Sequence, residues 1–127
     1  MDNKISYYAN GNMKEEHGYA PNGCLSFSNY FREDGNLEYS VDFDECGRVL
    51  EKYIYDSDNN LMIQEYNDYD ENICNREVFS YLPDESFIVK VYKIELQNID
   101  EPLPDKPIEI KYYNSYGQFQ SSTLCAN

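Results

Sequence analysis

Residues 31–49 have the sequence FREDGNLEYSVDFDECGRV, and this stretch decides the fold. Leu37, Tyr39, Val41 and Phe43 alternate with polar residues, which is typical of a strand with one apolar and one solvated face. Asp favours the early positions of a tight turn, and Gly supplies the positive φ that ends one. The stretch therefore predicts a turn, a strand and a second turn of the same kind.

The same module recurs along most of the chain. Each match has an aromatic residue, a polar turn and an apolar residue soon after it. The matches begin at Tyr8, Phe31, Phe43, Tyr55, Tyr66, Tyr81 and Tyr113. A turn of about five residues followed by about seven extended residues builds an antiparallel meander. We therefore predict an all-β fold, an antiparallel meander of repeated β-hairpins in a single twisted sheet. The sequence does not decide whether this sheet curls toward a half-barrel.

The chain has 127 residues, which suits a single β-repeat domain. We expect the repeats over about 5–96, a Pro-rich loop over about 97–107 and a closing hairpin over about 108–124. A short helix near Glu95 is compatible with the fading of the pattern there. The spacing of 11 residues between Tyr55 and Tyr66 reverses side-chain parity unless a bulge or an altered turn absorbs it, and the sequence leaves both open.

Charge is unevenly distributed along the chain. There are 24 acidic and 10 basic residues, a net charge of −14. Residues 32–85 hold 16 of the acidic and four of the basic ones, an excess of 16 − 4 = 12. Such a field repels nucleic acid and anionic lipid and attracts basic proteins, so we expect no direct nucleic-acid or membrane partner. The same charge would also keep a tyrosine-rich sheet soluble.

Motifs for catalysis or metal binding are not evident. His17 is the only histidine, and we interpret it as a solvated residue at a strand end. Asp56 begins a D-x-D-x-N segment, but Leu61 and Asn67 occupy the sixth and twelfth positions, where a calcium loop needs Gly and Glu. Weak cation binding at a turn stays open. We predict no enzyme activity, no cofactor and no metal site.

The four cysteines are dispersed, and no two form a C-x-x-C pair. They are Cys24, Cys46, Cys74 and Cys125. No apolar leader follows Met1, and no stretch approaches the length that spans a bilayer. We therefore expect free thiols and a cytoplasmic location, unless the chain is cut from a longer precursor.

Acidic turns lie close to tyrosines in the middle of the chain. In a meander, successive turns fall on opposite edges of the sheet. Charge speeds encounter with a basic partner, and buried aromatic rings supply affinity. The candidate partner-binding residues are Asp44, Glu45, Tyr53, Tyr55, Asp56, Asp58, Tyr66, Asp68, Tyr69, Asp70 and Glu71. Open edge strands would also permit a homodimer.

Two short segments carry a resemblance to known repeats. Residues 7–16, YYANGNMKEE, resemble the Y-Y-x-N-G-x-L-K-x-E core of the MORN-variant repeat. Residues 43–49, FDECGRV, resemble the Y-D-x-x-G-R-L core of Rhs/YD repeats, whereas the unit at Tyr55 has Asn59 and Asn60 in place of Gly and Arg.

The resemblance implies an immunity or antitoxin protein of a bacterial toxin system. Such a protein would neutralise a cognate basic toxin domain, of which a nuclease is the foremost candidate. A structural or adhesive β-repeat protein without an inhibitory role is the alternative, and it would come with further repeats or export to the cell surface.

Overall fold

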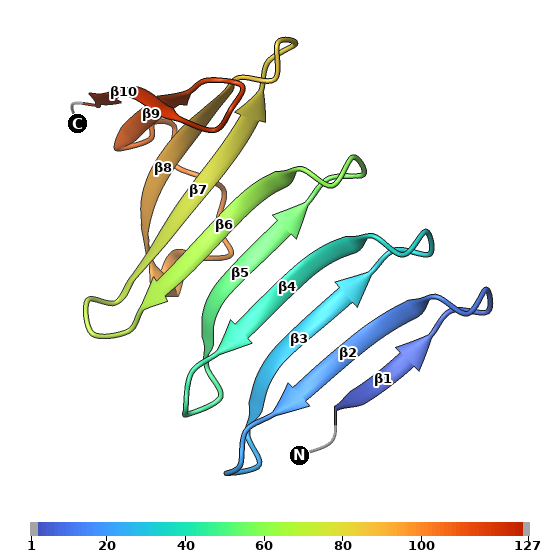
Figure 1. The fold of residues 1–127 in the computed structure, drawn as a ribbon. Coiled ribbons are helices and arrows are strands. Elements are labelled where there is room, and N and C mark those ends of the chain that lie inside the picture. The colour runs from blue at the N-terminus through green and yellow to red at the C-terminus, as the bar shows by residue number, and fades with distance from the viewer. Residues whose placement is uncertain (1–2, 126–127) are drawn as a thin grey trace. The chain divides into compact units, whose positions relative to one another are not determined.

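The computed structural model describes residues 3–125 and is all-β (Figure 1). The described residues divide into two compact units between Leu61 and Met62, at the start of β6. The strands are β1 (Lys4–Tyr7), β2 (Met13–Tyr19), β3 (Leu25–Phe31), β4 (Leu37–Phe43), β5 (Val49–Tyr55), β6 (Leu61–Asp68), β7 (Ile73–Tyr81), β8 (Phe87–Glu95), β9 (Glu109–Tyr113) and β10 (Phe119–Leu124).

In the first unit, β1 to β5 form an antiparallel meander in which each strand pairs with the next along the chain. The predicted β4 strand is confirmed at Leu37–Phe43. Each hairpin of this unit also contains a shift in register beside its turn, such as the one between Asp42 and Phe43. The predicted meander of hairpins is thus confirmed here.

The turns of the first unit share one backbone geometry. In the β4–β5 turn, the Gly47 amide donates to the Asp44 carbonyl oxygen at 3.0 Å, and the Asp44 amide donates to the Arg48 carbonyl oxygen at 2.8 Å. This is a three-residue hairpin loop, a type I turn followed by a residue in the left-handed region. Gly47 has φ 82° there, and Asn59 takes the equivalent place in the last turn with φ 71°.

The repeat differs in phase from the one that the sequence predicts. Tyr7, and not Tyr8, lies before the first turn and pairs with Met13. A further module was missed: Tyr19 pairs with Leu25 across the turn of residues 20–24. That turn holds Pro, Asn and Gly but no carboxylate, so a search guided by acidic turns passed over it.

The second unit is also an antiparallel meander, running from β6 to β10. Its strand β8 pairs with β7 on one side and β9 on the other, and it is buried on both faces. Val89 and Val91 are buried on one face, and Tyr92 and Ile94 on the other, the latter two packed with Cys74. Strand β8 is therefore a central strand that is covered on both faces.

The spacing of 11 residues from Tyr55 to Tyr66 is not the repeat of the structure, because Asn67, 12 residues after Tyr55, lies before the β6–β7 turn. Asp68 pairs directly with Ile73, which leaves a four-residue loop, and the positive φ moves to Asn72 at 59°. The residue two places before the loop is Asn67, which is 5% exposed and pairs with Cys74. The module placed at Tyr66 was therefore out of phase by one residue, because Asn67 and not an aromatic residue takes the position before this turn.

After β8 the chain forms one 3-10 turn, η1 (Leu96–Asn98), and then an irregular segment that contains three prolines. Leu96 and Ile99 pack against the core of Cys74, Tyr92 and Ile94. The short helix expected near Glu95 is this single turn. No helix in residues 3–125 is long and apolar enough to cross a membrane. All four cysteines are free.

Candidate functional site

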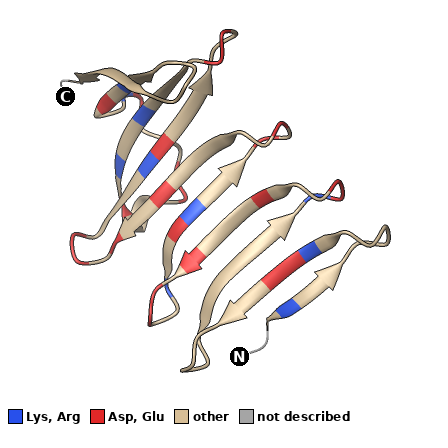
Figure 2. Ribbon diagram, viewed as in Figure 1, with Lys and Arg blue, Asp and Glu red and all other residues tan. Residues whose placement is uncertain are grey.

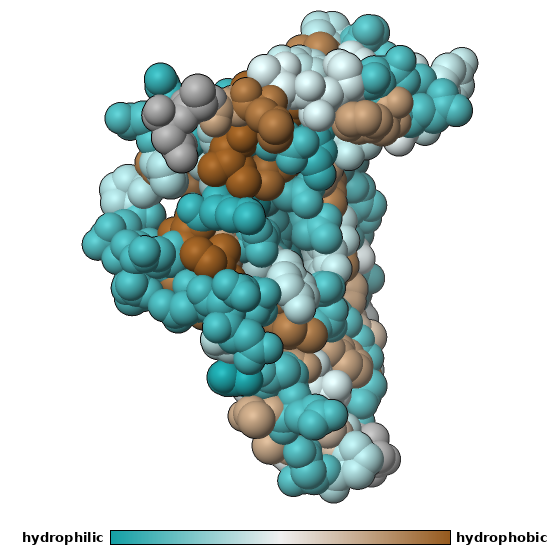
Figure 3. Space-filling view, turned by 90° about the vertical axis from the view of Figure 1, so that its left-hand side faces the viewer, coloured by the Kyte–Doolittle hydropathy of each residue, from teal (hydrophilic) through white to brown (hydrophobic). Residues whose placement is uncertain are grey.

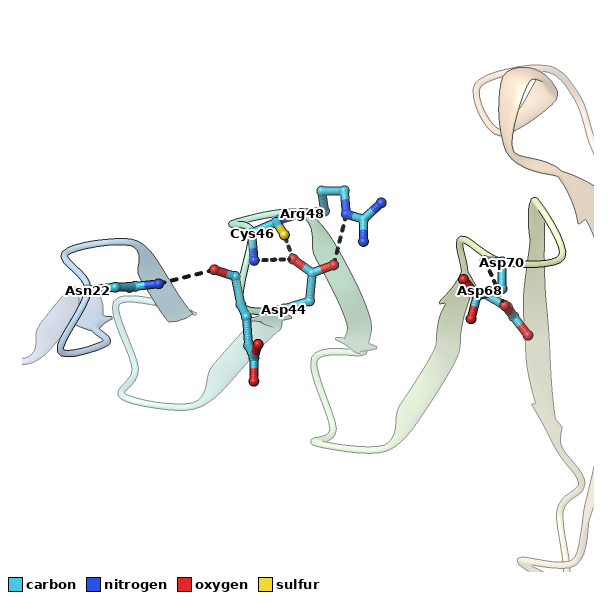
Figure 4. A network of polar contacts seen from close by, with 7 residues as sticks. Asn22, Asp44, Cys46, Arg48, Asp68 and Asp70 are labelled. Atoms are coloured by element: carbon cyan, nitrogen blue, oxygen red, sulfur yellow. Dashed lines mark hydrogen bonds and ion pairs between the residues drawn. The ribbon is translucent and has the colours of Figure 1, made fainter.

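Each acidic turn contains a carboxylate that caps its backbone. The Asp44 Oδ1 atom accepts hydrogen bonds from the Cys46 and Arg48 amides at 2.9 Å, and its Oδ2 atom accepts one from Arg48 Nε at 2.9 Å (Figure 4). These donors, the Arg48 amide foremost, lower the pKa of Asp44. Asp56 caps its turn in the same way, through the Asp58 and Asn60 amides. Such bonds hold the turn in one conformation.

A second carboxylate in most of these turns faces solvent. Glu45 follows Asp44, and Asp58 follows Asp56 by two positions; both are exposed, and neither caps a turn amide. The same division recurs elsewhere in the two units. The exposed members are Glu33, Glu45, Asp58, Asp70, Glu71 and Glu85. One group of carboxylates thus shapes the turns, and the other remains available to a partner.

The predicted residues of the first unit lie on two edges, as a meander requires. Asp44 and Glu45 are in the β4–β5 turn, whereas Asp56 and Asp58 are in the turn that follows β5 (Figure 2). The second edge is held together by side chains: Arg32 Nη2 donates to the Tyr55 carbonyl oxygen at 2.7 Å, and Asn59 Nδ2 donates to Asn36 Oδ1 at 3.3 Å. The structure does not gather these carboxylates into one site.

Tyr53 and Tyr55 lie on β5 between those edges and are half-buried. The Tyr53 hydroxyl donates to Glu51 Oε2, and this bond, with burial, raises the pKa of Tyr53 to about 12. Asp42 lies opposite Glu51 on β4, and its pKa is raised by burial and by the Glu51 charge. Tyr53 is therefore engaged within its own sheet.

The predicted residues of the second unit gather at one end of β6. Asp68 Oδ1 accepts from the Asp70 and Glu71 amides at 3.1 Å. A groove of about 190 Å³ opens beside this turn, lined by Asp68, Glu71, Ile73, Asn75 and Lys93. Tyr66 pairs with Asn75 across the strands and is 43% exposed. The groove therefore holds two carboxylates, and Tyr66 lies outside it beside the lining residue Asn75.

The β6–β7 turn is anchored to the segment after β8. Asn72 Nδ2 donates to Gln97 Oε1 at 2.8 Å, and the Leu96 amide donates to the Asn72 carbonyl oxygen at 3.1 Å. The side-chain nitrogen of the same residue, Gln97 Nε2, donates to Glu95 Oε2 at 2.8 Å. These bonds fix the loop that carries Asp70 and Glu71, which favours binding without loss of loop entropy.

An aromatic face of the first unit was missed at the level of sequence. The rings of Tyr30 and Tyr39 stack at 4.2 Å, and both line a groove of about 330 Å³. Glu15 and Glu38 also line it, together with Lys14. Tyr30 and Tyr39 are opposite one another on β3 and β4, which only the strand register reveals.

His17 was wrongly placed at a strand end. It lies within β2, with Nδ1 2.7 Å from Ser28 Oγ and Nε2 3.7 Å from Glu15 Oε1. Ser28, His17 and Glu15 together have the residue types of a hydrolytic triad. Ser28 is only 1% exposed, however, so its hydroxyl cannot reach a substrate in this conformation. We interpret it as a polar contact that joins β2 to β3. Within residues 3–125, no three His, Cys, Asp or Glu side chains gather as a metal site would require.

In the view of Figure 3, hydrophobic residues (brown) gather in small groups that hydrophilic residues (teal) separate from one another. The fold defines the class: an all-β protein of antiparallel hairpin modules whose turns are capped by Asp and Asn. No family model matches the chain, and no curated protein matches it.

Several solved structures are similar to the chain. They include the accessory secretory protein 1, 2 and 3 structure from Streptococcus pneumoniae (21% identity over 71% of this chain and 19% of that chain, TM-score 0.44). The GtfA/B complex bound to UDP and GlcNAc has 17% identity over 78% and 24%, with a TM-score of 0.40. TcdB2–TccC3 has 9% identity over 92% and 6%, with a TM-score of 0.44. The chain spans a quarter or less of the length of each.

Proposed function

We propose that this chain is an immunity or antitoxin-like protein that binds and neutralises a basic toxin domain, with a nuclease domain as the partner and the cytoplasm as the location. The observation that carries the proposal is that the turn carboxylates fall into two groups, one that caps the backbone and one that is exposed. Asp44, Asp56 and Asp68 fix the backbone, while their neighbours keep an exposed charge.

The exposed carboxylates supply the attraction. A nuclease cleft is cationic because it holds phosphates, so exposed carboxylates on rigid turns are complementary to it. Each unit contributes: 12 acidic and 5 basic residues lie in each, so each has an excess of seven negative charges. The groove at Asp68 and Glu71, with Tyr66 beside it, is the strongest single contact point.

The MORN-variant and Rhs/YD resemblance supports the proposal independently of charge. It concerns the same modules, since residues 43–49 include the capped turn of Asp44. Immunity proteins are among the proteins in which such repeats occur, and an acidic inhibitor of a nuclease needs no catalytic group of its own.

The proposal is tested by mixing the chain with the toxin domain encoded beside it and following association across a salt series. We expect tight binding whose association rate falls as salt rises. The double variant Asp70→Asn/Glu71→Gln should weaken binding about tenfold or more. Asp100→Asn/Glu101→Gln removes the same charge from the segment after η1 and should change binding far less. Equal losses for the two double variants, or no neighbouring toxin domain, would count against the proposal.

A structural or adhesive role is the second candidate, and one feature favours it. Turns on the same edge of the first unit are joined by side chains that bond to residues 23 positions away, such as Tyr8 Oη to the Phe31 carbonyl oxygen at 2.6 Å and Asn10 Nδ2 to the Glu33 carbonyl oxygen at 2.8 Å. These bonds would extend through any number of modules. Discovery of the chain within a longer exported array of repeats would favour this role.

A further inference from the structure

The strand β10 forms an open edge of the second unit. It pairs with β9 alone, and all six of its residues, Phe119 to Leu124, are exposed. Phe119 is 56% exposed and Leu124 is 80% exposed. Natural sheets protect such edges with charged side chains, prolines or bulges, because an unpaired row of amides and carbonyls accepts another strand.

Protection of this edge is incomplete. A register shift between Phe119 and Ser121 disturbs its first residues, but Ser121 to Leu124 pair regularly with β9. The Cys125 amide donates to the Ile108 carbonyl oxygen at 2.9 Å. Because hydrogen-bonded and free positions alternate along an antiparallel strand, the Ser122 and Leu124 backbone groups point away from β9, toward the open edge.

Charge makes this edge unlike the rest of the chain. Residues 112–127 contain no Asp, Glu, Lys or Arg, in a chain whose net charge is −14. The other long uncharged stretch, residues 17–31, lies mainly on β2 and β3, and both of those strands are paired on two sides. The edge strand of the first unit, β1, carries Lys4 and lies beside Glu15 and Glu16 of β2.

We infer that β10 pairs antiparallel with β10 of a second copy of this chain, joining two sheets through their uncharged edges. Two acidic copies repel each other over most of their surfaces, and β10 is the open edge at which they can approach without placing like charges opposite one another. Any antiparallel register of the strand with itself pairs only Gln, Ser, Thr, Phe and Leu side chains. A basic partner would gain nothing from charge at this edge, which favours a second copy as the occupant. The inference does not depend on toxin binding.

The test is sedimentation velocity over a concentration series, in reducing buffer with enough salt to screen the net charge. The parent chain should dimerise. Ser122→Pro removes an outward amide, and Ser122→Glu adds a negative charge to this edge of both copies; each should raise the dimer dissociation constant about tenfold or more. Ser6→Glu on β1 is the matched control and should leave the dimer dissociation constant unchanged. Circular dichroism should show that all variants keep the sheet.

A parent chain that stays monomeric at every concentration overturns the inference. So does a dimer that the two Ser122 variants leave intact, or one that Ser6→Glu disrupts, since that places the contact at β1. Hydrogen exchange gives a second measurement that needs no variant: the amides of Ser122 and Leu124 should become protected as concentration rises. Because self-association is read without any toxin domain, its failure leaves the proposed function standing, and the reverse also holds.

Discussion

Asp42 and Glu51 lie opposite each other on β4 and β5, and this pair makes the stability of the first unit depend on pH. Burial and the Glu51 charge raise the pKa of Asp42, so the native state binds more protons than the unfolded chain between the ordinary and the raised pKa. Its contribution to stability is complete at low pH and is lost as pH rises through the raised value. Ionised Asp42 therefore destabilises the protein at pH 7.

We expect Asp42→Asn to raise the urea midpoint at pH 7, because it keeps the shape of the side chain and removes its charge. At about pH 3, where most carboxyl groups are protonated, the difference from the parent should disappear. Asp58→Asn, at an exposed turn position, is the control and should shift the midpoint little. A lower midpoint for Asp42→Asn at pH 7 would mean that the carboxylate is stabilised by its neighbours.

Asp44 should behave in the opposite sense, since hydrogen bonds lower its pKa. Its contribution is present above the ordinary pKa and is lost as pH falls through the lowered value. Asp44→Ala should therefore reduce the urea midpoint at pH 7, and the loss should shrink in acid. Its neighbour Glu45→Ala should change stability by less than about 0.5 kcal/mol. Equal effects of the two changes would show that the cap does not hold the turn.

At the scale of the element, the turn decides how modules join. The sequence 32–36 can replace 44–48, because both are three-residue loops that end in a positive-φ glycine, and Asp34 caps its turn through the Asn36 amide at 2.9 Å. We expect this exchange to lower the urea midpoint no more than Asp44→Ala does, because it removes the Asp44 cap but keeps the loop length.

The same five residues placed at 68–72 should cost about 2 kcal/mol or more in urea unfolding. This loop is one residue longer, and a shorter loop would move Asn67 and Cys74 out of register. It would also remove the bond from Asn72 to Gln97. Tolerance of the exchange at both places would contradict the idea that loop length sets register.

The alternation of Leu37, Tyr39, Val41 and Phe43 was enough to predict β4, because period-two burial is a local property. The aromatic residue before each turn was harder to identify where tyrosines are adjacent, as at Tyr7 and Tyr8. Contacts between distant residues could not be predicted from the sequence. The stack of Tyr30 on Tyr39 depends on the strand register, and the bond from Asn72 to Gln97 depends on a distant segment. The candidate residues were found by composition, which could not separate capping carboxylates from exposed ones.

For the whole molecule, one excess of negative charge has two opposite consequences. Self-repulsion among 24 acidic residues destabilises the folded chain, and added salt screens it. We expect the melting temperature to rise with NaCl, whereas the rate of association with a basic partner falls.

The variant Glu33→Gln/Glu45→Gln/Asp58→Asn/Asp70→Asn should melt higher than the parent at low salt and respond less to NaCl. The four charges that it lacks come from turn positions that cap no amide. Neutral sucrose at matched osmolality should raise the melting temperatures of both proteins equally. A melting temperature that falls with NaCl would mean that ion pairs such as Arg76 with Glu65, at 2.8 Å and largely buried, outweigh the repulsion.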